Sequence, residues 1–149
     1  MNVKAWPLES KYQTVREIKH AVKTYHKDLL NFPKLANMSI PQFYNFVKQI
    51  PYTKDMPEAE IVSRPKYLLT IFRSLDCKKK SILFASFMLL KQGPGTFRFV
   101  LSSTRPDGKI SHIFTQILSN GKWINADATY SHNVLGSKKR VTNYEIVKG

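Results

Sequence analysis

The feature that most constrains the fold is an apolar run in the middle of the chain, within the stretch SLDCKKKSILFASFMLLKQG. The run extends from Ser81 to Leu90, which is too short to cross a bilayer but long enough for a buried helix. We therefore expect a central helix that begins near Cys77, continues to Lys91 and ends at Gly93, a residue type typical of helix ends.

The chain upstream of this run has the spacing of helices. The segment TVREIKHAVKTYHKDLL carries apolar residues at intervals of three and four, which predicts an amphipathic helix over 14–30. A second helix should begin at SIPQFYNFVKQI, where Ser39 and Gln42 have the spacing of a capping box. RPKYLLTIFRSL predicts a short helix with Pro65 in its first turn. Residues 51–63, with two prolines, are expected to form a loop with a brief extended piece.

The chain downstream of the run has the pattern of strands. TFRFVLSST, KISHIFTQIL and KWINADATY are rich in β-branched and aromatic residues, and the turn sequences RPDGK and SNGK separate them. Helices followed by antiparallel strands predict an α+β domain in which the cysteine helix packs on one face of the sheet. A chain of 149 residues is expected to form one domain, with 1–51 as its helical N-terminal part and 64–136 as its core.

The second turn sequence allows a prediction about two side chains. If Asn120 and Gly121 form a two-residue type I′ loop, counting outward along both strands places His112 and Asp127 on one face as diagonal neighbours. Such positions are about 7–8 Å apart at the backbone, within reach of an imidazole and a carboxylate that point toward each other. The turn therefore predicts a His–Asp pair, provided that no bulge interrupts the strands.

The single cysteine has two interpretations. A lone cysteine is most often a small buried residue, and the lysines at 78–80 are consistent with an exposed first helical turn. At a helix start, however, unpaired N–H groups and the helix dipole stabilise a thiolate, and the lysines add to that positive field. Asp76 is a natural N-cap for the turn that carries Cys77. With His112 as base and Asp127 orienting its ring, the thiol would have the partners of a catalytic nucleophile.

Together, LDCKKKSILFASFMLLKQG, SHIFTQI and KWINADATY resemble the transglutaminase-like superfamily. In that family a cysteine opens the central helix, a histidine follows on one strand, and an aspartate lies on the next strand shortly after a tryptophan. SRPKYLL is similar to the segment before the cysteine in small bacterial and phage members. The resemblance covers 64–136 and implies a papain-like fold with Cys77 as nucleophile, His112 as base and Asp127 as orienting acid. Trp123 corresponds to the aromatic residue before that acid.

This resemblance implies acyl transfer or hydrolysis on a peptide or carboxamide through a thioester, without a metal or cofactor. The backbone N–H of Cys77 is the natural first donor to an oxyanion. Tyr67, Gln42 and Gln49 are candidate sources of the second donor. Attack by water would make a protease or deamidase, and attack by a lysine amine would make a transglutaminase. We expect hydrolysis in a small basic domain.

The charge balance supports two alternatives. The chain has 24 Lys and Arg against 10 Asp and Glu, a formal net charge of +14 that favours acidic proteins, anionic surfaces or nucleic acid as partners. One alternative is a basic nucleic-acid-binding protein that uses Lys138, Lys139 and Arg140. The other is a catalytically inactive transglutaminase-like interaction or structural module, for example in a phage particle. The lysines are otherwise scattered, without a zinc-ligand spacing or a glycine-rich phosphate loop.

The expected location follows from the cysteine count and the N-terminal residues. One cysteine cannot form an intrachain disulfide and gives no sign of an oxidising compartment. The sequence MNVKAWPLESKYQTVREIKH is too polar for a signal peptide. We therefore expect a cytoplasmic protein without a membrane partner, or a virion-associated one if its origin is a phage.

Overall fold

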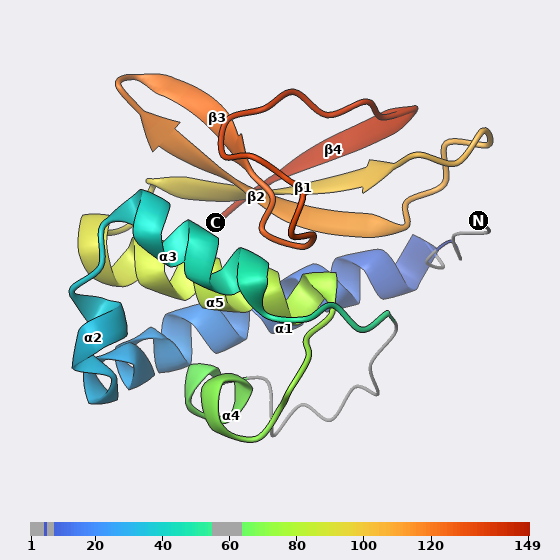
Figure 1. Cartoon of the computed structure of the whole chain (residues 1–149). Helices are drawn as coiled ribbons and strands as arrows, with labels where there is room; N and C mark the ends of the chain where they lie inside the picture. Colours follow the sequence, from blue (N-terminus) through green and yellow to red (C-terminus); the bar gives the residue numbers. More distant parts are fainter. Residues whose placement is uncertain (1–4, 6–7, 55–63) are drawn as a thin grey trace.

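The computed structural model describes residues 5, 8–54 and 64–149. It consists of helices packed on one face of a four-stranded antiparallel sheet, which is the α+β architecture expected from the sequence (Figure 1). Its elements are α1 (Leu8–Tyr25), the 3-10 helix η1 (His26–Asn31), α2 (Pro33–Ala36), α3 (Ile40–Gln49), α4 (Pro65–Thr70), α5 (Cys77–Gln92), β1 (Phe97–Ser103), β2 (His112–Ser119), β3 (Lys122–Ala126) and β4 (Asn143–Lys148).

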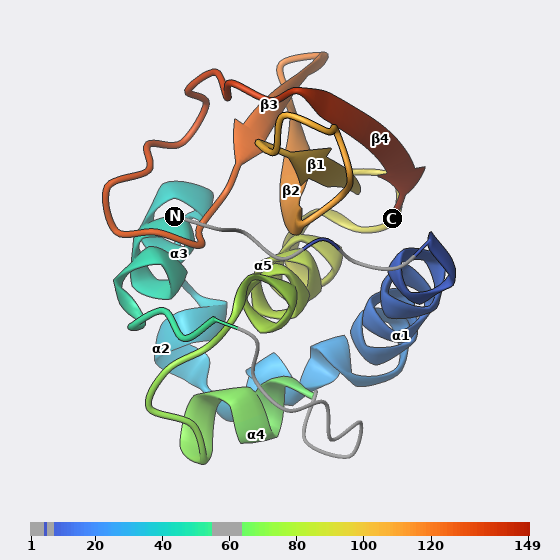
Figure 2. The same cartoon turned by 90° about the vertical axis from the view of Figure 1, so that its right-hand side faces the viewer.

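Helix α5 is the predicted central helix and lies in the middle of the helical layer (Figure 2). It contacts α1, α3, α4 and η1 as well as β1 and β2, and its residues 81–88 are all buried. The Asp76 side chain caps its start by accepting a hydrogen bond from the Lys79 N–H at 2.9 Å. Gly93 ends the helix with a φ of 90°, a conformation that favours glycine. No helix in the described part of the chain has both the length and the apolarity that crossing a membrane requires.

The other helices follow the sequence pattern with one difference. The expected helix over 14–30 is divided, because α1 ends at Tyr25 and the chain continues as the tighter η1. In η1, the buried Asp28 carboxylate forms an ion pair at 2.6 Å with the partly exposed Arg64, and this pair ties η1 to the start of α4. The capping box predicted for α3 is confirmed, since both of its reciprocal hydrogen bonds between Ser39 and Gln42 are present.

The sheet has the strand order β3-β2-β1-β4. Asn120 and Gly121 have φ values of 51° and 78°, as a type I′ turn requires, and the expected register between β2 and β3 is confirmed. Strand β3 is shorter than the predicted strand over 122–130, because the chain leaves the sheet after Ala126. There the Asp127 carbonyl accepts a hydrogen bond from the Tyr44 hydroxyl at 2.8 Å. Edge strand β4 was not predicted and lies outside the predicted core of 64–136.

Alternate residues of the strands point to two different environments. The inner face packs against the helices and is made by Phe97, Phe99, Leu101, Ile113, Thr115, Ile117, Ile124 and Ala126. The opposite, outer face is made by Arg98, Val100, Ser102, His112, Phe114, Gln116, Leu118, Trp123, Asn125, Tyr144, Ile146 and Lys148. This face is not open throughout, because Val100, Ser102 and Phe114 are buried and His112, at the start of β2, interacts with Cys77 of α5.

The segment that joins β3 to β4, residues 127–142, swings out beside α3 before it returns to the sheet (Figure 2). The Lys48 ammonium of α3 donates to the Asn133 carbonyl at 3.1 Å. Further along, the Gly136 N–H donates to the Asn125 carbonyl of β3 at 2.7 Å. These contacts hold the segment against both α3 and the free edge of β3.

Candidate active site

Cys77 is the first residue of α5, and its side chain is largely buried, with 6% exposed. The preceding chain is fixed by a short parallel bridge between Tyr52 and Leu75. In this bridge the Leu75 N–H donates to the Pro51 carbonyl at 2.9 Å, and the Thr53 N–H donates to the Leu75 carbonyl at 3.1 Å. The N-cap and the bridge therefore fix the two residues directly before Cys77. The Cys77 N–H lies in the first turn of the helix and has no intrahelical acceptor.

His112 and Asp127 form the contact that the turn sequence predicted. His112 Nε2 lies 2.9 Å from Asp127 Oδ2. The other carboxylate oxygen, Oδ1, accepts a hydrogen bond from the Thr129 N–H at 3.0 Å. Because an ionised carboxylate only accepts hydrogen bonds, Nε2 must carry the proton, and Nδ1 remains for another partner. The Cys77 side chain also interacts with His112, since both its hydrogen-bonding capacity and its charge raise the pKa of the imidazole.

The charges of the site are coupled. Burial lowers the pKa of His112, but the charges and hydrogen bonds of Asp127 and Cys77 outweigh burial and leave the pKa raised. Burial raises the pKa of Asp127, but His112 and Lys139 outweigh it and leave the pKa lowered. The arrangement therefore favours an imidazolium beside a carboxylate.

Lys139 belongs to this site, although from the sequence it is a candidate for contact with nucleic acid. Its ammonium forms an ion pair with the same Asp127 Oδ2 that contacts His112, and it lies 5.2 Å from the centre of the Phe114 ring. Its neighbours Lys138 and Arg140 are exposed. Lys139 is one of the three cations predicted to contact an external anion. In the structure its partner is instead a carboxylate of the same chain.

Lys80 is a second cation beside the site, and only 1% of it is exposed. Its ammonium donates to the Ile50 carbonyl at 2.5 Å and to the Thr129 carbonyl at 2.7 Å, which joins α5 to the end of α3 and to the segment after β3. Burial lowers the pKa of Lys80 to about 8, although the charge of Asp127 acts in the opposite direction. Lys79 is also buried, 3.7 Å from Asp76 Oδ2. An exposed first turn is therefore wrong for Lys79 and Lys80.

Three rings, those of Tyr130, His132 and Tyr52, form an aromatic wall beside His112. Tyr130 stacks near-parallel to His112 at 6.2 Å and to His132 at 5.5 Å, and Tyr52 contacts Tyr130 at 4.9 Å. Burial raises the pKa of Tyr130, a hydrogen bond with Tyr52 lowers it, and the charges of Cys77 and Asp127 raise it further. The Tyr130 hydroxyl is thus electrostatically coupled to the thiol.

The remaining predicted site residues lie elsewhere. Gln42 accepts the capping hydrogen bond from the Ser39 N–H at 2.9 Å, and both Gln42 and Gln49 line a surface groove along α3. Tyr67 lies on α4, its ring 5.8 Å from the Arg64 guanidinium. Among the described residues, no hydrogen bond or ring contact joins Gln42, Gln49 or Tyr67 to Cys77.

Trp123 belongs to the outer face of the sheet. It pairs across the strands with Leu118, and the Arg98 guanidinium lies 4.2 Å from the centre of its ring. It precedes Asp127 by four positions on the same strand and its extension. The structure therefore gives this tryptophan a cationic neighbour rather than a contact with the thiol.

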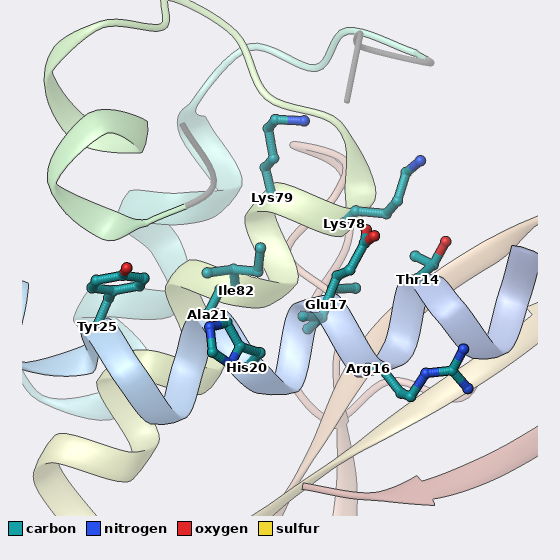
Figure 3. A pocket seen from close by; sticks show the side chains of 10 residues that line it. Thr14, Arg16, Glu17, His20, Ala21, Tyr25, Lys78, Lys79 and Ile82 are labelled. Atoms are coloured by element: carbon teal, nitrogen blue, oxygen red, sulfur yellow. The ribbon is translucent and has the colours of Figure 1, made fainter. Parts of the chain in front are cut away.

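A cavity of about 330 Å³ lies between α1 and the first turns of α5 (Figure 3). Its lining includes Tyr25, Ile82 and Lys79, but none of the three residues Cys77, His112 and Asp127. In the ranges that the structure describes, no three histidine, cysteine or acidic side chains gather where they could hold a metal ion.

The site residues that the sequence predicted and those that it missed differ in the kind of signal that marks them. Cys77, His112 and Asp127 were marked by local patterns, namely a helix start and a turn. Lys80 and Tyr130 depend on contacts between distant segments, and no local pattern indicated them.

Comparison of the chain with protein-family models, with curated proteins and with solved structures found no match.

Proposed function

We propose that this protein is a cysteine-dependent acyltransferase or hydrolase of the transglutaminase-like, papain-like kind, acting on a peptide or carboxamide. The observation that carries the proposal is the position of His112, which is 2.9 Å from the Asp127 carboxylate and close enough to Cys77, at the start of α5, for the thiol to raise its pKa. A thiol, a base and a group that orients the base are the three parts that nucleophilic cysteine catalysis needs.

In the first half of the reaction, the Cys77 thiolate attacks the substrate carbonyl and forms a tetrahedral oxyanion. His112, protonated at Nδ1, transfers this proton to the leaving amine as the carbon–nitrogen bond breaks. The products are a thioester on Cys77 and a free amine, or ammonia when the substrate is a primary carboxamide. Asp127 holds Nε2–H throughout and keeps the ring oriented.

In the second half, His112 removes a proton from the incoming nucleophile, which attacks the thioester carbonyl. Collapse of the second tetrahedral species breaks the carbon–sulfur bond and returns the thiolate. Water as nucleophile gives a carboxylic acid, and a lysine amine gives an isopeptide bond. We favour hydrolysis, the outcome expected from a small basic domain.

The oxyanion needs at least two hydrogen-bond donors. The backbone N–H of Cys77 is the first, because it projects from the first turn of α5. For the second we favour the Tyr130 hydroxyl over Tyr67, Gln42 and Gln49, because the Tyr130 ring stacks on His112 at 6.2 Å, whereas among the described residues no hydrogen bond or ring contact joins the other three to the site. The hydrogen bond of Tyr130 with Tyr52 would hold the ring in place.

The test is turnover of a glutamine-containing peptide, followed by ammonia release and by the mass of the product. We expect the native protein to release ammonia, and Cys77→Ala and His112→Ala to release none. Tyr130→Phe should retain the thioester chemistry at a rate about a hundred- to a thousand-fold lower, the usual cost of losing one oxyanion donor. Absence of both ammonia release and peptide cleavage would instead favour the catalytically inactive interaction module.

A further inference from the structure

A row of polar side chains crosses the outer face of the sheet. Lys148 of β4, Arg98 of β1, Gln116 of β2 and Asn125 of β3 are directly paired across the strands. The Arg98 Nε–H donates to Gln116 Oε1 at 2.8 Å, and the Gln116 amide donates to Asn125 Oδ1 at 2.8 Å. With strands spaced about 4.8 Å apart, the row is roughly 14 Å long, and its amides are held in fixed orientations.

Arg98 is the centre of this row. Its Nε–H is bound to Gln116 and its guanidinium plane lies 4.2 Å from the centre of the Trp123 ring. Within the described part of the chain, its two terminal nitrogens have no hydrogen-bond partner. Arg98 is partly exposed. A guanidinium held by one nitrogen and one ring keeps its remaining donors in a fixed direction, which suits a phosphate group.

The row continues beyond the edge of the sheet. The Asn125 amide donates to the Ser137 carbonyl at 3.1 Å, and Ser137 is followed by the exposed Lys138 and, two residues later, the exposed Arg140. A path of positive charge therefore runs from Lys148 on one edge strand, through Arg98, to the segment beside the other edge.

The rest of the outer face supplies rings and apolar groups but no negative charge. Tyr144, Ile146 and Leu118 are exposed by 60%, 42% and 41%. Among the described strand residues, the outer face carries no carboxylate. Asp127, the residue directly after β3, has a carboxylate, but only 3% of the residue is exposed.

We propose that this outer face binds single-stranded nucleic acid. Cations that follow a backbone and aromatic rings on which bases stack are the two parts of such a surface, and fixed side-chain amides can hydrogen-bond base edges. The net charge of +14 favours a polyanion and opposes a second copy of the chain as the occupant. An acidic peptide would use the cations, but it would leave the stacked Trp123 and the ordered amides without a function.

The test is fluorescence anisotropy of a labelled oligothymidine of about 12 nucleotides, titrated with the full chain at several salt concentrations. We compare Arg98→Gln/Lys148→Gln with Lys23→Gln/Lys27→Gln, which removes the same charge from exposed positions on the helical side. The first double variant should bind much more weakly and lower the salt slope by about 1.4, since each lost phosphate contact on a single strand contributes about 0.7. The second should bind nearly as the native protein does.

Trp123→Ala should weaken binding at least about fivefold through lost stacking. Lys148→Gln alone, at an exposed strand end, serves as a variant that keeps the fold, and it should still lower affinity and salt slope. Cys77→Ala should bind the oligonucleotide normally, so that this proposal and the proposed catalysis fail or succeed separately.

Equal losses in the two double variants would overturn the proposal, because binding would then follow net charge rather than this face. Failure of the native protein to bind at low salt would also overturn it. So would tight binding of a polyglutamate peptide that Arg98→Gln/Lys148→Gln weakens while the oligonucleotide binds weakly, an outcome that identifies an acidic protein as the partner.

Discussion

The two faces of the sheet come from the same four strands but have different compositions. The inner face is apolar, and residues such as Phe99, Leu101 and Ile113 are completely buried against the helices. The outer face carries His112, which reaches Asp127, and the hydrogen-bonded row through Arg98 and Gln116. The comparison teaches that the inner face is built almost entirely for packing, whereas the outer face carries the polar groups to which we assign the two proposed functions.

The prediction with the largest expected effect makes the same change, leucine to alanine, at one residue on each face. Leu101→Ala, at a residue with 0% exposure, should lower the free energy of unfolding by about 2–5 kcal/mol through lost burial and a residual cavity. Leu118→Ala, at 41% exposure, should change it by no more than about 0.5 kcal/mol. Urea unfolding measures both, and similar losses would mean that the outer face is covered as the inner face is.

The next test concerns Asp127, whose charged side chain is buried in the candidate site. Its folded-state pKa is lowered, so the unfolded state binds more protons in acid, and the stabilisation is present above about pH 4 and lost as the pH falls through the folded-state value. Asp127→Asn should therefore be about 2–3 kcal/mol less stable than the native protein at neutral pH, and the gap should close on acidification.

Urea midpoints at a series of pH values measure this gap. Asp107→Asn is the control, because its carboxylate is exposed beside Arg105 and its substitution should change stability far less. A gap for Asp127→Asn that stays constant down to pH 2 would show that the carboxylate charge does not stabilise the fold.

Substitution of Lys80 tests whether a cation beside the site also stabilises the fold. Lys80→Met removes the donor to two carbonyl groups and should cost about 2 kcal/mol, part of the loss being offset because a buried cation is no longer needed. Lys91→Met is the matched control, since Lys91 also donates to a carbonyl, that of Ala36, but is exposed. Thermal or urea unfolding should show at least a threefold smaller loss for the control, and equal losses would contradict the structural role of Lys80.

The smallest expected effect separates two neighbouring lysines. Lys139→Met should cost about 1 kcal/mol, because Asp127 keeps its hydrogen bonds from His112 and the Thr129 N–H. Lys138→Met removes the same charge from an exposed position and should cost nearly nothing. Indistinguishable unfolding curves for the two variants would mean that the Lys139–Asp127 pair contributes nothing to stability.

Much of the fold could be predicted because its signals are local. The apolar run and its flanking Asp76 and Gly93 define α5, and the Asn120–Gly121 turn alone sets the register that brings His112 to Asp127. Strand β4 could not be predicted in the same way, because it is half exposed and pairs with β1 across a long sequence separation.

The missed parts of the site also depend on distant segments. Lys80 is buried because carbonyl groups from residues 50 and 129 converge on it, and Tyr52 reaches Tyr130 because the chain forms a short bridge beside Leu75. From the sequence, an exposed first helical turn is one of two interpretations of the lysines at 78–80, and it is reasonable because a buried lysine is rare without such acceptors.

The most direct test of the proposed site is the pH dependence of iodoacetamide alkylation at Cys77, in the native protein and in His112→Ala. Because the chain has a single cysteine, every S-carbamidomethylated cysteine, located by peptide mass, reports on this thiol. We predict that the native protein reacts well below neutral pH, and that His112→Ala reacts only as the pH approaches about 8.5, as an ordinary thiol does. The same profile in both proteins, or a native thiol that reacts only after unfolding, would contradict a catalytic pair of Cys77 and His112.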